Sequence, residues 1–255
     1  MVKKPKTKES AFFHLLMEYS KQMEELGTFD EEKYQFLRAE LDKIAKTNVQ
    51  FADSRRAFMA TISRKKKDYE DAIKNLKATN NFADARAEEY IHILNDGYAS
   101  EAFAIAPKVL DERHFNQDRD VFKAIVSNGG FQLVNEYVLN AQNRQEFIKP
   151  RQLFVIVQEV VQVMKQLGVS DLDIVRMNDV VGEILRETND LFVWPGATAE
   201  ISTLTDENGV QLLIEYFVPV TPSVAAKMSW DLVERLVDRE IDKPGVSLNF
   251  LGIAA

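Results

Sequence analysis

Residues 201–218 read ISTLTDENGVQLLIEYFV and contain two runs in which apolar and polar side chains alternate, with Leu204 as one interruption. Such alternation is typical of strands that are buried on one face only. The dipeptide Asn208-Gly209 between the runs suits a tight hairpin turn, because both residues tolerate a positive φ. The stretch therefore predicts an antiparallel β-hairpin.

Helices are predicted on both sides of this hairpin. Upstream, Ser170 with Asp173 fits a capping box, and apolar residues follow at helical spacing. Downstream, Thr221 suits an N-cap with Pro222 at the first helical position, and a last strand is expected over residues 246–253. The order helix, hairpin, helix, strand predicts a small α/β part in which helices cover one face of a three-stranded sheet.

Residues 153–157, Leu-Phe-Val-Ile-Val, allow two interpretations. As a buried strand they would complete a ferredoxin-like order of elements. As a helix they would begin a longer element, because apolar residues continue at helical spacing through Val163 and Leu167. We favour the helix, since nothing breaks this pattern.

The composition changes near Pro150. Of the 255 residues, 1–149 hold seven valines and two prolines, whereas 150–255 hold seventeen and five. Because β-branched residues favour strands and prolines favour turns, we predict an α+β chain with a helical domain, 1–150, and a mixed α/β domain, 151–255. The second domain also carries the whole formal net charge of −8.

The N-terminal domain shows helical periodicity almost throughout. Two helices that meet near Gly27, with Thr28 and Glu31 as a capping box, predict an antiparallel hairpin. A third, long helix is expected from about Asn48 to Lys77. The domain is therefore predicted to be an array of antiparallel helical hairpins.

A weak repeat crosses this array at separations of 31 and 33 residues, a period typical of helical repeats. The repeated motifs are FADSR at 51–55, FADAR at 82–86 and FNQDR at 115–119. Residues 82–98 resemble the second helix of a tetratricopeptide unit, with Phe82, Ala85, Tyr90 and Leu94 near the expected positions. The small-residue signature of that unit's first helix is missing, so an irregular helical array is the alternative to a tetratricopeptide-like one.

Sequence motifs for common catalysis are absent. The chain has no cysteine, which removes disulfides, thiolate metal sites and cysteine nucleophiles. It contains no Walker loop, no Gly-x-Gly-x-x-Gly, no Gly-x-Ser-x-Gly and no His-Glu-x-x-His. We therefore predict a protein that is not an enzyme, with no catalytic residues, no cofactor and no metal.

Two helical turns pair a carboxylate with a histidine, Glu89 with His92 and Asp111 with His114. This spacing occurs in di-iron carboxylate bundles, but those also need inward glutamates on two further helices. No such glutamates stand out in the sequence, so histidines on helix surfaces are the preferred interpretation.

Partner contacts are predicted from charge and from one aromatic side chain. A basic cluster could neutralise the phosphates of a nucleic acid, although a solvated helix segment is the preferred interpretation. The cluster consists of Arg64, Lys65, Lys66 and Lys67. Phe13 is a candidate contact, because adjacent Phe12 and Phe13 cannot both face one helix core. Two acidic helices, near 171–190 and 231–242, would favour a basic partner or form an ordinary charged face.

These observations predict a protein–protein interaction or adaptor protein. Its helical array would bind a protein partner, and its α/β domain would form a homo-oligomer or a second contact. The alternatives are a nucleic-acid-associated regulator that uses the basic N-terminal region and an enzyme of unfamiliar type. No run of about twenty apolar residues is present and the start lacks a secretory apolar core, so we expect a soluble, cytoplasmic protein without membrane contact.

Overall fold

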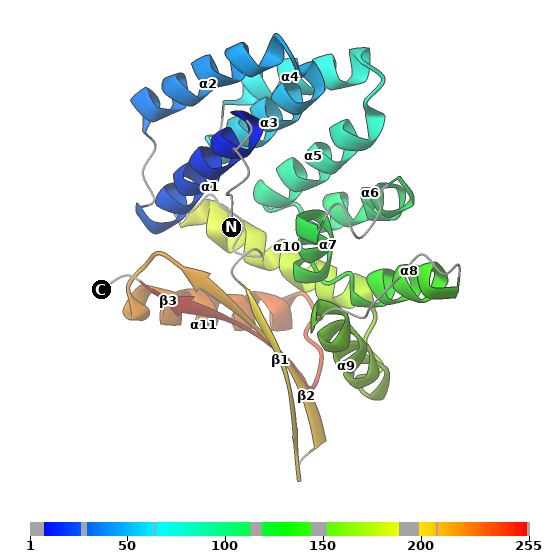
Figure 1. Cartoon of the computed structure of the whole chain (residues 1–255). Helices are drawn as coiled ribbons and strands as arrows, with labels where there is room; N and C mark the ends of the chain where they lie inside the picture. The colour runs from blue at the N-terminus through cyan, green and yellow to red at the C-terminus, as the bar shows by residue number, and fades with distance from the viewer. Residues whose placement is uncertain are drawn as a thin grey trace, which may run out of the picture. The chain divides into compact units, whose positions relative to one another are not determined.

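The computed structural model describes residues 8–26, 30–63, 65–112, 119–143, 152–188, 199–207 and 209–253 (Figure 1). The chain divides into two compact units, residues 1–95 and 96–255. The division predicted near Pro150 falls outside the described residues and stays a prediction, and the helices of residues 96–143 belong to the second compact unit. The described residues are mostly helical, with one small mixed sheet, in agreement with an α+β chain.

The first unit consists of helices among its described residues. They are α1 (Lys8–Leu26), α2 (Glu31–Ala45), α3 (Val49–Ile62), α4 (Lys66–Ala78) and α5 (Phe82–Asn95). One core packs α1, α2 and α3 together around Leu16, Tyr19, Leu37 and Leu41, which are buried almost completely. Tetratricopeptide-like hairpins are not confirmed, and Phe82, at the start of the resemblance, is half exposed.

The prediction of one long helix from Asn48 to Lys77 is wrong, because α3 and α4 are two separate helices. Ser63 ends α3, and its backbone N–H bonds to the carbonyl of Met59. The next residues, 64–68, are all polar. No apolar side chain in this stretch therefore needs a continuous helix in order to reach the core. The predicted start of α2 also shifts, because its N-cap is Asp30, whose carboxylate accepts a hydrogen bond from the backbone N–H of Lys33 at 2.9 Å. Thr28, the predicted cap, lies outside the described residues.

The second unit contains helices and all three described strands. The helices are α6 (Ala99–Asp111), α7 (Arg119–Ser127), α8 (Phe131–Asn143), α9 (Gln152–Leu167), α10 (Asp171–Glu187) and α11 (Pro222–Asp238). The strands are β1 (Glu200–Asp206), β2 (Gly209–Val218) and β3 (Val246–Gly252). Residues 153–157 are helical at the start of α9, where Phe154 and Val157 are buried, which confirms the favoured interpretation.

The sheet has the order β1-β2-β3. The predicted hairpin is confirmed, since β1 and β2 pair antiparallel with Ile201 opposite Ile214. Helix α11 then connects β2 to β3, which pairs with β2 in parallel. Figure 1 shows the two strands of the hairpin running side by side, with α11 near β3. Alternate side chains of β2, including Ile214 and Tyr216, are buried on the helix-covered face.

Polar side chains of helix α10 form hydrogen bonds that connect it to α6 and to the turn before α6. The predicted capping box of Ser170 and Asp173 is present at its N-terminus. The carboxylate of Asp179 accepts hydrogen bonds from the backbone N–H and the hydroxyl of Ser100 at 2.9 and 2.5 Å, which caps the first turn of α6. Near the other end, the guanidinium of Arg186 donates to the carbonyl of Gly97 at 2.7 Å.

Candidate functional site

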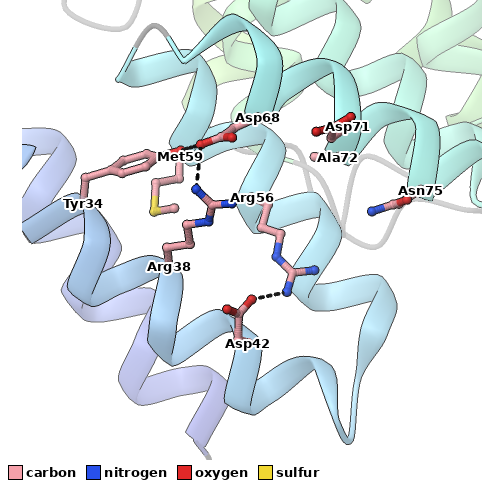
Figure 2. Close-up of a pocket in the computed structure, with 9 residues that line it drawn as sticks. All are labelled: Tyr34, Arg38, Asp42, Arg56, Met59, Asp68, Asp71, Ala72 and Asn75. Atoms are coloured by element: carbon pink, nitrogen blue, oxygen red, sulfur yellow. Dashed lines mark hydrogen bonds and ion pairs between the residues drawn. The ribbon is translucent and has the colours of Figure 1, made fainter.

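A polar pocket of about 230 Å³ lies among α2, α3 and α4 in the first unit (Figure 2). Charged and amide side chains dominate its wall. They include Arg38 and Asp42 from α2, Arg56 from α3, and Asp68, Asp71 and Asn75 from α4. Because most of the lining side chains are polar, the pocket is suited to polar or charged groups rather than to an apolar ligand.

Helix periodicity places these side chains on facing surfaces. Tyr34, Arg38 and Asp42 follow one another at intervals of four residues along α2. Residues four apart share a helix face, so all three point toward α3 and α4. The buried stripe of α2, which includes Leu37 and Leu41, lies beside them and holds the helix against the core.

The rim of the pocket is fixed by a hydrogen-bonded group of three residues. The hydroxyl of Tyr34 donates to Oδ2 of Asp68 at 2.5 Å, and the guanidinium of Arg38 lies 3.3 Å from the same oxygen. Burial, and next the hydrogen bond to the Asp68 carboxylate, raise the pKa of Tyr34 well above its ordinary value. Tyr34 therefore stays protonated near neutral pH and acts as a hydrogen-bond donor.

The floor of the pocket is held by Arg56. Its guanidinium donates to Oδ1 of Asp53 and to Oδ1 of Asp42, each at 2.6 Å. Asp53 is buried, so the pair neutralises a carboxylate that would otherwise be costly inside the protein. Burial acts to lower the pKa of Arg56, but the hydrogen bonds to Asp42 and Asp53 outweigh it and raise that pKa. Arg56 is therefore a fixed cation that is already paired with two carboxylates.

Arg38 is the most accessible cation of the pocket. Its side chain is 49% exposed, against 25% for Arg56, and it makes one long contact to Asp68 rather than a short bidentate pair. A carboxylate from another molecule could approach Arg38 without displacing a short hydrogen bond. The exposed carboxylate of Asp71 lies on the same wall, so the pocket can receive an anionic group beside a cationic one.

The predicted basic cluster is only partly available for a partner. Lys65 donates to Glu31 at 2.7 Å and lies 5.6 Å from the ring centroid of Tyr34, so its charge is already paired with residues of α2. Lys66 and Lys67 are exposed in the first turn of α4. Arg64 lies outside the described residues. The structure therefore pairs Lys65 with α2 and leaves Lys66 and Lys67 facing solvent.

Phe13 is half-buried rather than fully exposed. Its neighbour Phe12 is 2% exposed and packs in the core, while the guanidinium of Arg55 lies 5.3 Å from the ring centroid of Phe13. The same guanidinium lies 5.5 Å from the ring of Phe51, and Nε of Arg55 is buried without a hydrogen-bond partner. Arg55 therefore acts as an internal cation–π contact and does not extend the basic cluster.

His92 is used in packing. Its ring stacks on Tyr69 with centroids 3.8 Å apart, and its Nδ1 lies 3.4 Å from the hydroxyl of Thr61. Glu89, one turn earlier, lies 3.8 Å from Lys77. His114 lies outside the described residues. Among the residues that the structure describes, no group of three potential ligands is placed to hold a metal ion.

Much of the acidic face predicted on α10 is paired within the second unit. Asp171 accepts hydrogen bonds from the backbone N–H groups of Gln132 and Leu133, each at 2.9 Å. Asp173 bonds to Ser170 and Lys243; burial acts against ionisation, yet these bonds hold the pKa of Asp173 at about 2. Further along α10, Glu183 and Glu187 bind Arg235 of α11, and Glu183 also binds Arg239 just after it, at 2.6 to 3.1 Å. On and after α11, Glu234, Asp238, Glu240 and Asp242 are exposed.

One prominent surface residue does not follow from the predicted sites. Trp230 of α11 is 77% exposed, and Val233 and Val237 beside it are about half exposed. The core stripe of α11 is buried and consists of Ala225, Met228, Leu232 and Leu236. The sequence signal for the outer surface is that α11 carries a second apolar series at helical spacing, which one core cannot bury.

Comparison of the chain with protein-family models, with curated proteins and with solved structures finds no match. No helix within the described ranges has the length and apolar character to cross a bilayer.

Proposed function

We propose that the protein is a non-enzymatic protein–protein interaction or adaptor protein. Its helical array binds a protein partner, and its α/β part provides a dimerisation surface or a second contact. The observation that carries this proposal is Trp230, a large aromatic side chain that is 77% exposed on a regular helix. Burial of this tryptophan and of the two half-exposed valines beside it against another protein would be favourable in free energy, and such exposed apolar patches mark interaction surfaces.

The pocket of α2, α3 and α4 is the surface proposed for the partner of the array. It presents an accessible cation, Arg38, on a helix packed against the core of the first unit. A rigid surface with fixed donors loses little conformational entropy on binding. The partner is therefore expected to insert a carboxylate side chain next to Arg38.

A matched pair of charge reversals tests this proposal. Wild-type protein, Arg38→Glu and the control Lys46→Glu would each be used to capture proteins from lysate of the native host, with recovery quantified by mass spectrometry. Lys46 is exposed at the end of α2 and does not line the pocket. A partner that binds wild type and Lys46→Glu but is lost with Arg38→Glu supports the proposal. Equal recovery with all three, or no specific protein at all, contradicts it.

A nucleic-acid-associated regulator remains the second candidate, favoured by the exposure of Lys66 and Lys67 in one turn of α4. Each phosphate contact made by a lysine should steepen the salt dependence of binding. Reversal of both to Glu should therefore weaken binding to a duplex and reduce the slope of log affinity against log salt. Unchanged affinity and slope would eliminate this version.

A further inference from the structure

We propose that the outer surface of α11 is a homodimer contact, in which α11 of a second copy of this chain packs antiparallel across a twofold axis near Trp230. This inference deepens the dimerisation part of the proposed function and rests on it. It does not depend on the pocket of the helical array, so each can fail without the other.

The contact surface is an apolar stripe separate from the core stripe of α11. Trp230, Val233 and Val237 are 77%, 47% and 54% exposed, and the small side chain of Ala226 is exposed as well. Their spacing of four, three and four residues places them on one helix face. The core stripe lies on another face, so burial of the outer stripe requires a surface from outside the described part of this unit.

The position of Trp230 favours a symmetric arrangement. Helix α11 runs from Pro222 to Asp238, and Trp230 lies eight residues from either end. In an antiparallel pair of identical helices, residues near the twofold axis meet their own equivalents. An axis near the middle of α11 therefore brings the two copies of Trp230 together, and tryptophan is one of the residue types enriched at the energetic centre of interfaces.

The charges beside the stripe complement an antiparallel second copy. Lys227 lies three residues before Trp230 and Glu234 four residues after it, and both are exposed on the same flank of α11. With the axis near Trp230, Lys227 of each copy comes level with Glu234 of the other, so the same ion pair forms twice. In a parallel twofold pair this flank of one helix would meet the opposite flank of the other, so Lys227 and Glu234 would not pair with each other.

A basic amphipathic segment of another protein is the competing occupant of the stripe. It gains support from the composition of residues 96–255, which hold 24 acidic and 14 basic side chains for a net charge of −10. However, Lys227 would repel such a segment at one end of the stripe, whereas a second copy satisfies both Lys227 and Glu234. The second copy is therefore the better match to the observed charges.

The dimer should be weak, because the contact is small. Each helix of 17 residues is about 25 Å long. Two such helices bury an area at the low end of specific interfaces, which is consistent with a dissociation constant in the micromolar range.

Reciprocal charge reversal provides the decisive experiment on the full chain. Sedimentation velocity over a range of concentrations should show a monomer–dimer equilibrium for wild type. Lys227→Glu and Glu234→Lys should each weaken self-association by at least about tenfold, because two attractive pairs become repulsive. An equimolar mixture of these two variants should dimerise, since each provides the charge that the other lacks. The double variant Lys227→Glu/Glu234→Lys should recover self-association for the same reason.

Matched controls separate this contact from general charge effects. Lys165→Glu and Glu159→Lys change exposed residues of α9 by the same charges and should dimerise like wild type. Trp230→Ser should remain folded in circular dichroism, because the side chain is exposed, but should be monomeric. A wild type that stays monomeric at all concentrations, or charge variants that dimerise as wild type does, would overturn the proposal. A mixture of the two reversals that stays monomeric would overturn it as well, and none of these results would bear on capture through Arg38.

Discussion

Gly182 of α10 lies directly against the backbone of Gly97, at the turn that precedes α6. A Cβ atom built on Gly182 would lie 2.8 Å from Cα of Gly97, which is closer than real side-chain contacts allow. Gly97 itself has a φ of +78°, and the guanidinium of Arg186 holds its carbonyl. The helix and the turn therefore approach so closely only because both positions lack a side chain.

This close approach predicts that Gly182→Ala is destabilising although Gly182 lies inside a helix. At an ordinary helical position the same change would stabilise by about 0.5–1 kcal/mol, because alanine restricts the unfolded chain. Here the new methyl group must push two backbones apart, and we expect a loss of about 3 kcal/mol in the free energy of unfolding measured with urea. The control is Gly168→Ala, with open space around the Cβ but a φ of +68°, for which a loss of only about 1 kcal/mol is expected. A gain in stability for Gly182→Ala would contradict the observed packing.

Asp171 should make stability depend on pH. The residue is 6% exposed; burial raises the pKa of its carboxyl group to about 6, although hydrogen bonds from three backbone N–H groups oppose the shift. Because the folded protein then binds the proton more tightly than the unfolded chain, the contribution of Asp171 is fully present below the ordinary pKa of about 4. It is lost as the pH rises through about 6. Between about pH 4 and pH 7 the free energy of unfolding of wild type should fall by about 2 kcal/mol more than that of Asp171→Asn. Parallel pH profiles for the two proteins, measured by urea unfolding, would show that Asp171 has an ordinary pKa.

Local signals in the sequence predict much of the second unit. The hairpin around Gly209 and the capping box of Ser170 are confirmed, because turn and cap chemistry acts within a few residues. The capping role of Asp171 was not predictable in the same way. Its carboxylate turns away from its own helix to the N-terminus of α8, and only the folded arrangement brings Gln132 within reach.

The candidate surfaces depend on tertiary contacts and were harder to predict. The basic cluster is recognisable in the sequence, but only the structure shows that Lys65 donates a hydrogen bond to Glu31, which is 34 residues away. The exposure of Trp230 was missed because its apolar series overlaps the core series on the same helix. Periodicity shows which residues share a face and leaves open which face the core covers.

The ion-pair network between α10 and α11 should contribute measurably to thermal stability. Arg235 donates to Glu187, Asp231 and Glu183, and Glu183 also accepts from Arg239. Hydrogen bonds to Glu187 and Asp231 raise the pKa of Arg235 further, so it is charged at every accessible pH. We expect Arg235→Ala to lower the melting temperature by a few degrees, with a smaller difference at high salt because ions screen exposed pairs. The matched control Arg176→Ala removes an exposed arginine of the same helix pair and should leave the melting temperature nearly unchanged. An equal effect of both variants would argue against the network.

The buried hydrogen bond between Tyr216 and Asn178 predicts a strongly non-additive pair of substitutions. The hydroxyl of Tyr216 donates to Oδ1 of Asn178 at 2.5 Å, both residues are inaccessible to solvent, and Nδ2 of Asn178 has no partner. Tyr216→Phe should cost about 1–3 kcal/mol in the free energy of unfolding, because it leaves a buried amide oxygen without its donor. Asn178→Leu alone should cost a similar amount, because it leaves the buried hydroxyl of Tyr216 without its acceptor.

The double variant Tyr216→Phe/Asn178→Leu should lose less than the sum of the two single variants. Replacing both partners by apolar groups of similar shape removes the unsatisfied atoms together with the bond. A thermodynamic cycle from urea unfolding gives the coupling between the residues, which should be about 1 kcal/mol or more. Additive losses would mean that the hydroxyl and the amide do not depend on each other, and that the orphaned Nδ2 atom is the main cost at this site.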